Sequence, residues 1–487
     1  MKILFASSEA VPLVKTGGLA DVSGALPQAL RRQHQDVRLV LPAYRSVLDR
    51  VGDCSTVARL VVHGQPVDLL ETRLDDSRVP VYLVHTPALY DRPGNPYVGA
   101  DGQDWPDNAD RFAHLARVVV EIATDRAGLR WQPELVHCND WQTALAPALL
   151  SREVKRPATL FTIHNLAYQG LFDWPTLQRL GLPEEWWSWQ ALEFHGHLSF
   201  IKGGLAFADW ISTVSPTYAR EIRTPRFGYG LEGLLEHRAD RLGGILNGVD
   251  YSVWDPRHDP LLPATYNGRS LAGKRRCREA LQQRFDLDTN AAAPLFAHIG
   301  RLVEQKGVDL ILDCLPKLLA EGAQLVVLGS GDARLEAALR AAATKTPGRV
   351  GVHIGYDEAL AHLIEAGADS FLMPSRFEPC GLNQLYSLRY GTVPVVHRTG
   401  GLADSVVDTT EETLAAGSAT GFQFDMPTAE ALAGALERAL DAWRQPKLWR
   451  QLVASGMRQD FSWTRSARSY LELYHRILSS PRHPAPA

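Results

Sequence analysis

The chain has few cysteines, no strong excess of one charge and no long apolar run. Its five cysteines are scattered through 487 residues without a Cys-x-x-Cys spacing, which argues against a disulfide framework or a structural zinc site and fits a reducing cytosol. With 51 basic and 55 acidic residues the net charge is −4, so nucleic acid is not an expected partner. Glu9 interrupts the first apolar run too early for a signal peptide, and no other run is long enough to cross a bilayer. These absences predict a cytoplasmic protein that binds neither nucleic acid nor a membrane.

Two common nucleotide-binding fingerprints, GxGxxG and GxxxxGK[ST], are also absent, so a dinucleotide-dependent dehydrogenase is the weakest candidate. The string Thr-Gly-Gly-Leu-Ala-Asp occurs twice instead, at residues 16–21 and 399–404. Each copy follows a strand-like run and opens a helix-like stretch. A glycine pair lets backbone N–H groups approach a ligand closely, and a helix N-terminus favours negative charge. The repeat therefore predicts an anion-binding turn in each half, although Gly-Gly is also a common turn.

Short apolar runs alternate with helical patterns along the whole chain, which predicts α/β domains with parallel sheets covered on both faces. We expect strands at 3–6, 37–41, 79–84, 135–137, 159–163 and 210–214, and a second series at 295–299, 324–328, 350–353, 370–373 and 393–396. The length favours two or three domains.

The domain boundary is expected near residues 242–256, where Gly243-Gly244 and Asn247-Gly248 mark turns. This gives an N-terminal domain at 1–245 and a C-terminal domain at 246–460. Residues 255–268 look like a surface loop, 465–478 show helical periodicity, and 481–487 are expected to be a frayed tail.

Positive charge follows two of the expected strands. Lys15 precedes the first Gly-Gly turn, and its compact charge beside amide donors suits a pyrophosphate. Arg301 and Lys306 follow the strand at 295–299 and also suit phosphate oxygens, and this interpretation is favoured over the alternative of a solvated helix start. Glu378 follows the strand at 370–373, where it would accept hydrogen bonds from sugar hydroxyls or cap a helix.

Further polar residues end strands of the first half. His164 ends the strand at 159–163, where a histidine is more often a structural donor than a catalyst. Asp140 and Trp141 follow the strand at 135–137, and a carboxylate beside an indole is a common carbohydrate platform. Asp286 and Asp288 form an acid-x-acid pattern that some enzymes use for a metal, but a surface loop is favoured and no metal is assigned.

Taken together, these stretches resemble the bacterial glycogen synthases and plant starch synthases. The matching stretches are 15–22, 90–97, 137–141, 162–165, 247–250, 300–307, 378–382 and 399–404. The resemblance implies a GT-B fold, in which two Rossmann-like, doubly wound domains face each other across a deep cleft and a helix at 461–480 crosses back to the first domain. It also implies retaining transfer of glucose from ADP-glucose to the non-reducing end of an α-1,4-glucan, with no cofactor and no metal.

The resemblance also implies roles for individual residues. The catalytic residues would be Glu378, His164, Arg301 and Lys306. The nucleotide sugar would be bound by Lys15, Gly18, Asp21, Asn247, Arg301, Lys306, Tyr356, Thr399, Gly400, Gly401 and Leu402, with the diphosphate on Lys15, Arg301 and Lys306. Tyr97, Asp140, Trp141 and His164 would contact the sugar and the acceptor.

Two positions depart from relatives. Many retaining GT-B enzymes carry a second glutamate eight positions after the first, where this chain has Tyr386, which weakens any two-carboxylate mechanism. Cys138-Asn139 stands where relatives often have Ala-His. Other readings are a GT-B epimerase, a phosphorylase-like enzyme, a sucrose- or trehalose-type synthase, and a sensor that kept the fold and lost activity. The choice of ADP over UDP rests on the resemblance alone.

Overall fold

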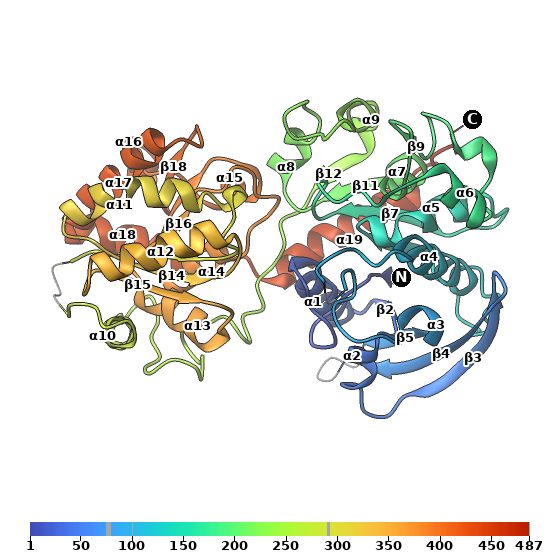
Figure 1. Cartoon of the computed structure of the whole chain (residues 1–487), viewed down its shortest axis with the longest axis horizontal. Helices are drawn as coiled ribbons and strands as arrows, with labels where there is room; N and C mark the ends of the chain where they lie inside the picture. The colour runs from blue at the N-terminus through green and yellow to red at the C-terminus, as the bar shows by residue number, and fades with distance from the viewer. Residues whose placement is uncertain (75–78, 100, 290–292, 487) are drawn as a thin grey trace. The chain divides into compact units, whose positions relative to one another are not determined.

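The structure is a computed structural model of the chain that describes residues 1–74, 79–99, 101–289 and 293–486. The chain divides into two compact units (Figure 1). Unit 1 comprises Met1–Gly248 and Trp463–Ala487, and unit 2 comprises Val249–Ser462. The boundaries predicted from the sequence, 245/246 and 460/461, lie within three residues of these. Within the described residues, none of the helices combines the length and apolar character that a membrane span requires.

Unit 1 is built on a nine-stranded sheet of order β12-β11-β7-β6-β1-β2-β5-β4-β3. Its strands are β1 (Lys2–Ala6), β2 (Asp36–Pro42), β3 (Ser55–Val62), β4 (Gln65–Arg73), β5 (Pro80–His85), β6 (Leu135–Asn139), β7 (Ala158–Ile163), β11 (Trp210–Thr213) and β12 (Leu242–Gly244). Pairing is parallel from β12 to β5. Ile3, Leu4 and Phe5 of β1 are fully buried, and because neighbouring side chains point to opposite faces, both faces of the sheet are covered.

The remaining elements of unit 1 surround this sheet. A small sheet of order β8-β10-β9 consists of β8 (Leu171–Phe172), β9 (Glu193–Phe194) and β10 (His197–Ser199). The helices are α1 (Gly18–Arg32), α2 (Arg45–Leu48), α3 (Pro87–Tyr90), α4 (Asn108–Ala123), α5 (Leu145–Ser151), α6 (Trp174–Arg179), α7 (Phe200–Phe207), α8 (Pro216–Glu221), α9 (Glu232–His237) and α19 (Trp463–Ser479). The last helix, α19, joins unit 1 through a 2.9 Å hydrogen bond between Tyr474 Oη and His137 Nδ1.

Unit 2 contains a parallel six-stranded sheet of order β15-β14-β13-β16-β17-β18. Its strands are β13 (Leu295–Ile299), β14 (Gln324–Gly329), β15 (Val350–Ile354), β16 (Ser370–Met373), β17 (Val393–His397) and β18 (Phe422–Phe424). Its helices are α10 (Ala272–Arg284), α11 (Val308–Ala320), α12 (Ala333–Lys345), α13 (Glu358–Gly367), α14 (Asn383–Tyr390), α15 (Gly400–Ser405), α16 (Glu411–Ala415), α17 (Ala429–Trp443) and α18 (Pro446–Met457). The α/β class expected from the sequence is confirmed.

One edge of the unit 1 sheet is not parallel, contrary to expectation. The long strands β3 and β4 form an antiparallel hairpin, and β4 also pairs antiparallel with β5 (Figure 1). His63 and Gly64 join the hairpin with φ angles of 50° and 76°. Two successive positive φ values are typical of a tight type I′ turn, so the edge is closed locally without a crossover helix.

The predicted turn at Gly243-Gly244 is wrong, because both residues lie in β12. A Cβ at Gly244 would lie 2.0 Å from the carbonyl oxygen of Ser215, so the glycine permits close backbone packing instead of a turn. The predicted frayed tail is also wrong at its start. The His483 amide donates to Asp209 Oδ1 at 2.7 Å, and Arg241 donates to the Pro481 carbonyl at 3.0 Å.

Residues 255–268 are irregular as expected, but they are not merely a surface loop. Asp259 is fully buried and accepts hydrogen bonds from His362 Nδ1 at 2.7 Å and from Tyr390 Oη at 2.6 Å. The Trp254 indole stacks on the His362 imidazole with ring centroids 3.7 Å apart. Burial opposes charge on this imidazole, but the hydrogen bonds and charges of Asp259 and Glu358 raise the pKa of His362 to about 9. The loop is therefore tied to α13 by a buried ion pair.

This ion pair should make the stability of unit 2 depend on pH. A histidine whose pKa is about 9 when folded and near 6.5 when unfolded stabilises fully below pH 6.5 and loses that contribution as the pH rises through 9. We expect His362→Gln to lower the free energy of unfolding by up to about 3 kcal/mol more at about pH 6 than at about pH 9.5. Denaturant unfolding of both proteins at the two pH values measures this difference.

The matched control is His298→Gln, since burial lowers the pKa of His298 to about 4 and its imidazole is neutral in the folded state. The change in the free energy of unfolding that His298→Gln causes should therefore not disappear at high pH. An equal destabilisation by His362→Gln at both pH values would contradict a charged pair.

Candidate active site

Three neighbouring parallel strands place the candidate residues of unit 1 at one edge of the sheet. The strands β1, β6 and β7 are adjacent, and ligands of open α/β sheets bind beyond the carboxyl ends of such strands. Residues 7–18 follow β1, residues 140–141 follow β6, and residues 164–165 follow β7. The structure therefore joins Asp140 to His164 by a hydrogen bond, and it places Lys15 in the loop that follows the neighbouring strand β1.

The first Thr-Gly-Gly turn is open. No heavy atom lies within 4 Å of a Cβ built on Gly17 or Gly18, and Gly18 begins α1. As the first residue of a helix, Gly18 has an amide without an intrahelical acceptor. Lys15 Nζ lies 2.8 Å from Asp21 Oδ1, and the Lys15 side chain is 47% exposed. The two charged residues predicted here are thus ion-paired with each other beside an accessible amide.

The loops after β6 and β7 are joined by hydrogen bonds. Asp140 Oδ1 accepts from the His164 amide at 2.7 Å, and His164 Nε2 lies 3.0 Å from Asn139 Oδ1. Burial raises the pKa of Asp140 to about 7 and lowers the pKa of His164 to about 3. The imidazole is therefore neutral at neutral pH, with its Nε2–H directed to Asn139. Asp140 has φ of 55°, a backbone conformation that residues other than glycine rarely adopt. The hydrogen bonds around Asp140 hold it in this conformation.

Sequence reasoning missed Glu9 as a site residue. Its carboxylate is almost fully buried, and it accepts from the Thr16 amide at 2.5 Å and from the Gly17 amide at 3.2 Å. Tyr97 Oη, a predicted sugar contact, lies 3.3 Å from Glu9 Oε1 and 2.7 Å from Ser8 Oγ. The available signal was a carboxylate three residues after the strand β1, whose residues 3–6 are apolar, at the edge where ligands bind.

Two other predicted residues of unit 1 differ in their surroundings. Trp141 is packed in an aromatic cluster, with ring centroids 4.9 Å from Phe112 and 6.1 Å from Phe172, and a Cβ on Gly170 would overlap its ring at 2.4 Å. Trp141 is nevertheless only partly buried, so its predicted contact with the sugar or the acceptor stays a prediction. Asn247 is buried, and its Oδ1 has no partner within the described part of the chain.

In unit 2 the strands β13, β16 and β17 are adjacent, and the loops after them carry the predicted residues. Lys306 Nζ and Glu378 Oε2 form an ion pair of 2.5 Å, and Ser375 Oγ donates to the same oxygen at 3.1 Å. Glu378 is buried, and α14 begins only at Asn383, so the carboxylate does not cap that helix. The sequence left two roles open for Glu378, a helix cap and a site residue. The structure excludes the cap of α14 and shows a buried carboxylate that is paired with Lys306.

Arg301 and Tyr356 are both solvent-exposed. Arg301 follows β13, and one of its guanidinium nitrogens donates to Gln305 Oε1 at 3.0 Å, so the partner in this hydrogen bond is neutral. Tyr356 follows β15, is 79% exposed and donates its hydroxyl to Glu358. Both side chains are accessible to a ligand.

The second Thr-Gly-Gly turn differs from the first. A Cβ on Gly400 would lie 1.9 Å from the Glu378 carbonyl oxygen, and one on Gly401 would lie 2.0 Å from that of Cys380. The amides of Thr399, Gly401 and Leu402 donate to protein carbonyls, that of Gly401 to Glu378 at 3.1 Å. The expectation that this turn offers these three amides to a ligand is therefore corrected: its glycines allow close packing that positions the Glu378 segment.

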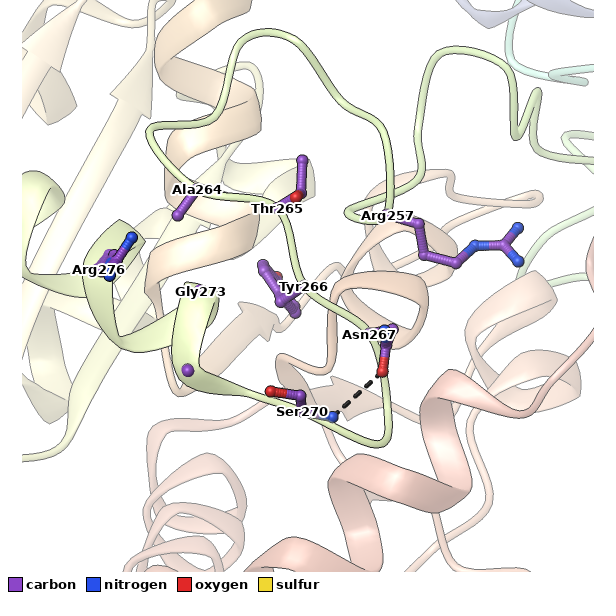
Figure 2. Close-up of a pocket in the computed structure, with 9 residues that line it drawn as sticks. Arg257, Ala264, Thr265, Tyr266, Asn267, Ser270, Gly273 and Arg276 are labelled. Atoms are coloured by element: carbon purple, nitrogen blue, oxygen red, sulfur yellow. Dashed lines mark hydrogen bonds between the residues drawn. The ribbon is translucent and has the colours of Figure 1, made fainter.

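A pocket of about 380 Å³ lies elsewhere in unit 2, at the start of α10 (Figure 2). It is lined by Arg257, Ala264, Thr265, Tyr266, Asn267, Ser270, Ala272, Gly273 and Arg276, none of which is a predicted site residue. The Arg257 guanidinium points away from the other labelled residues and is paired with Asp255 at 2.6 Å. Across the described ranges, no cluster of three or more His, Cys, Asp or Glu side chains suits a metal ion.

The sequence is similar to known proteins over nearly its whole length. Residues 2–237 match the starch synthase catalytic domain family, and residues 280–454 match the glycosyl transferases group 1 family. The chain is 59% identical over 483 residues to the glycogen synthase of Thioalkalivibrio sulfidiphilus, covering 98% of this chain and 100% of that protein.

Solved structures agree with the fold. The catalytic domain of starch synthase IV from Arabidopsis thaliana, bound to ADP and acarbose, matches with a TM-score of 0.88 and 33% identity, covering 98% of this chain and 99% of that one. Sucrose-phosphate synthase from Thermosynechococcus elongatus, 16% identical, matches with a TM-score of 0.60 over 99% and 100% of the two chains and shows the fold alone. The expected GT-B fold class is confirmed.

The contrast between the two glycine turns can be tested by stability. Gly400→Ala should destabilise unit 2 by about 1–3 kcal/mol, because the new methyl group would overlap the Glu378 carbonyl and Gly400 has φ of 44°. Gly18→Ala is the matched control, since open space surrounds its Cβ position, and it should change the free energy of unfolding by no more than about 0.5 kcal/mol. Urea unfolding measures both, and equal effects would contradict the assignment.

Proposed function

Because this chain belongs to the family of bacterial glycogen synthases and plant starch synthases, we propose that it lengthens an α-1,4-glucan by retaining transfer of glucose from ADP-glucose to the non-reducing end. The observation that carries this proposal is the near-complete match to a protein named glycogen synthase, with 59% identity over 98% of the chain. A nucleotide sugar and a glucan are the corresponding substrates, and the chain is a glucosyltransferase.

We assign the diphosphate of the donor to Lys15 and the Gly18 amide in unit 1 and to Arg301 and Lys306 in unit 2. Breaking the bond between glucose and phosphate places negative charge on the departing ADP. Cations and amides that are already in place stabilise that charge with little reorganisation. Arg301 suits this role because its guanidinium is exposed and donates to Gln305, which is neutral.

The sugar is assigned to residues that can accept or donate hydrogen bonds at the strand ends. Glu378 would accept from glucosyl hydroxyls, with Lys306 Nζ beside its carboxylate. Neutral His164 would lie against the donor sugar, with its backbone carbonyl near the reacting carbon, while Asp140 and Tyr97 contact sugar hydroxyls. Asn247 also suits a hydroxyl donor, because its Oδ1 is buried and lacks a partner among the described residues.

Retention commonly requires a carboxylate nucleophile on the far face of the sugar. No such residue is assigned here, and Tyr386, eight positions after Glu378, instead stacks on Trp254 with ring centroids 4.0 Å apart. We therefore favour attack from the same face, in which the acceptor hydroxyl gives its proton to the departing phosphate oxygen. This route needs no protein base.

We also propose that the reaction needs neither a metal nor a cofactor, because cationic side chains can neutralise the diphosphate. Chelation with EDTA should leave turnover unchanged. A cytoplasmic location fits the five cysteines, which are all free thiols.

The cationic assignment predicts losses in three single variants. Lys15→Ala, Arg301→Ala and Lys306→Ala should each lose about 1.5–3 kcal/mol of charge-assisted bonding, or roughly 10- to 100-fold in kcat/KM for ADP-glucose. Lys345→Ala, an exposed lysine of α12, is the matched control and should behave as wild type. Near-normal kinetics in all three variants would remove the diphosphate assignment.

Glu378 is expected to act on the glucosyl group more than on the nucleotide. Glu378→Ala should lower kcat much more than it weakens ADP binding, which calorimetry measures separately from turnover. Glu378→Gln keeps an acceptor oxygen and should be less impaired. Unchanged turnover in Glu378→Ala would reduce this residue to a structural partner of Lys306.

The activity itself is tested by offering ADP-glucose or UDP-glucose with glycogen or oligomaltose as primer and following chain growth. Growth from ADP-glucose supports the proposal. Preference for UDP-glucose would correct the donor, absence of growth with a small-sugar acceptor used instead would favour a sucrose- or trehalose-type synthase, and ligand binding without turnover would favour a sensor.

A further inference from the structure

We propose that Glu9 is a positioning residue, which holds the Lys15–Gly18 turn in the arrangement that binds the donor diphosphate and links that turn to Tyr97. This inference rests on the proposed function. The residue follows β1, and neither its burial nor its charge is required by the parallel sheet itself.

The carboxylate of Glu9 uses both oxygens. Oε2 accepts from the Thr16 amide at 2.5 Å, from Thr16 Oγ1 at 2.8 Å and from the Gly17 amide at 3.2 Å. Oε1 accepts from Tyr97 Oη at 3.3 Å. Three donors from one turn converge on one oxygen, so the backbone on either side of the turn has little freedom to rotate.

The bonds to Glu9 determine which groups of the turn remain for a ligand. The amides of Thr16 and Gly17 are directed to Glu9, whereas the next residue, Gly18, begins α1 in open space. Lys15, the residue before Thr16, directs Nζ to Asp21 and not to Glu9. Glu9 therefore acts on the diphosphate ligands from behind the turn, without contacting the ligand itself.

A simple counter-ion role does not explain a carboxylate in this place. Burial raises the pKa of Glu9, and hydrogen bonds from Thr16, Gly17 and Tyr97, all neutral donors, counter that effect. Its charge also raises the pKa of nearby Asp140, a predicted sugar contact. A buried carboxylate held only by neutral donors is costly, and the cost is understandable where it orders a functional turn.

The test measures ADP binding by calorimetry in Glu9→Gln, alone and combined with Lys15→Ala. In the wild-type background we expect Glu9→Gln to weaken ADP binding at least about fivefold, because a neutral amide oxygen holds the donors of Thr16 and Gly17 less strongly than a carboxylate oxygen does. In the Lys15→Ala background the same change should cost less than about twofold, since the turn no longer presents its cation. Equal losses in both backgrounds, or no loss in either, would overturn the proposal.

Two further variants separate positioning from general stability. Glu365→Gln replaces another fully buried carboxylate, in unit 2, and should leave ADP affinity unchanged whatever it does to unfolding. Thr16→Val removes only the hydroxyl donor and should weaken ADP binding about twofold, which keeps the test open if Glu9→Gln does not fold. If both Thr16→Val and Glu9→Gln bind ADP with wild-type affinity, the proposal that Glu9 positions the Lys15–Gly18 turn is refuted.

Failure of this inference is distinguishable from failure of the proposed function. Wild-type protein that binds ADP but transfers no glucose contradicts the function and leaves the comparison of affinities intact. Glu9→Gln protein that binds ADP as tightly as wild type contradicts the inference while transfer by the wild type still stands.

Discussion

Buried carboxylates that must be hydrogen-bonded determine the shape of the loops around the candidate site. An ionised carboxylate loses its hydration on burial and is tolerated only where donors replace the water. Glu9 accepts hydrogen bonds from the amides of Thr16 and Gly17, and Asp140 accepts one from the amide of His164. In each case the sheet supplies a rigid strand end, and the carboxylate then orders the irregular chain that follows it.

In unit 2 a buried carboxylate is stabilised by a cation as well as by a neutral donor. Glu378 is buried beside Lys306 and Ser375, and its own carbonyl accepts from the Gly401 amide. Removing one partner of a buried pair leaves an uncompensated charge, so these residues act as a unit. Three loops after neighbouring strands are thereby joined, and none of them is positioned by its own sequence alone.

The ion pairs also bear on how an anionic ligand would bind. Lys15 lies against Asp21 in unit 1 and Lys306 against Glu378 in unit 2, so an anion that binds either lysine would have to share that cation with a carboxylate. The partners keep the lysines oriented before a ligand arrives, which limits the side-chain entropy lost on binding. Arg301 is exposed and donates to the neutral Gln305, so its hydrogen-bond partner does not compete with an anion for its charge.

The sequence by itself determined the α/β class, the series of parallel strands and the family, because apolar periodicity and the order of motifs depend only on the order of residues along the chain. It also located Lys15, Asp140, His164, Arg301, Lys306 and Glu378 at strand ends. It did not distinguish the two Thr-Gly-Gly copies, since identical residues gave an open turn at Gly18 and a packed one at Gly400. Nor did it show that Glu9 accepts hydrogen bonds from the first turn, or that the Trp141 ring contacts Phe112 and Phe172. Those outcomes depend on which atoms from distant segments come within a few ångströms, and only tertiary packing decides that.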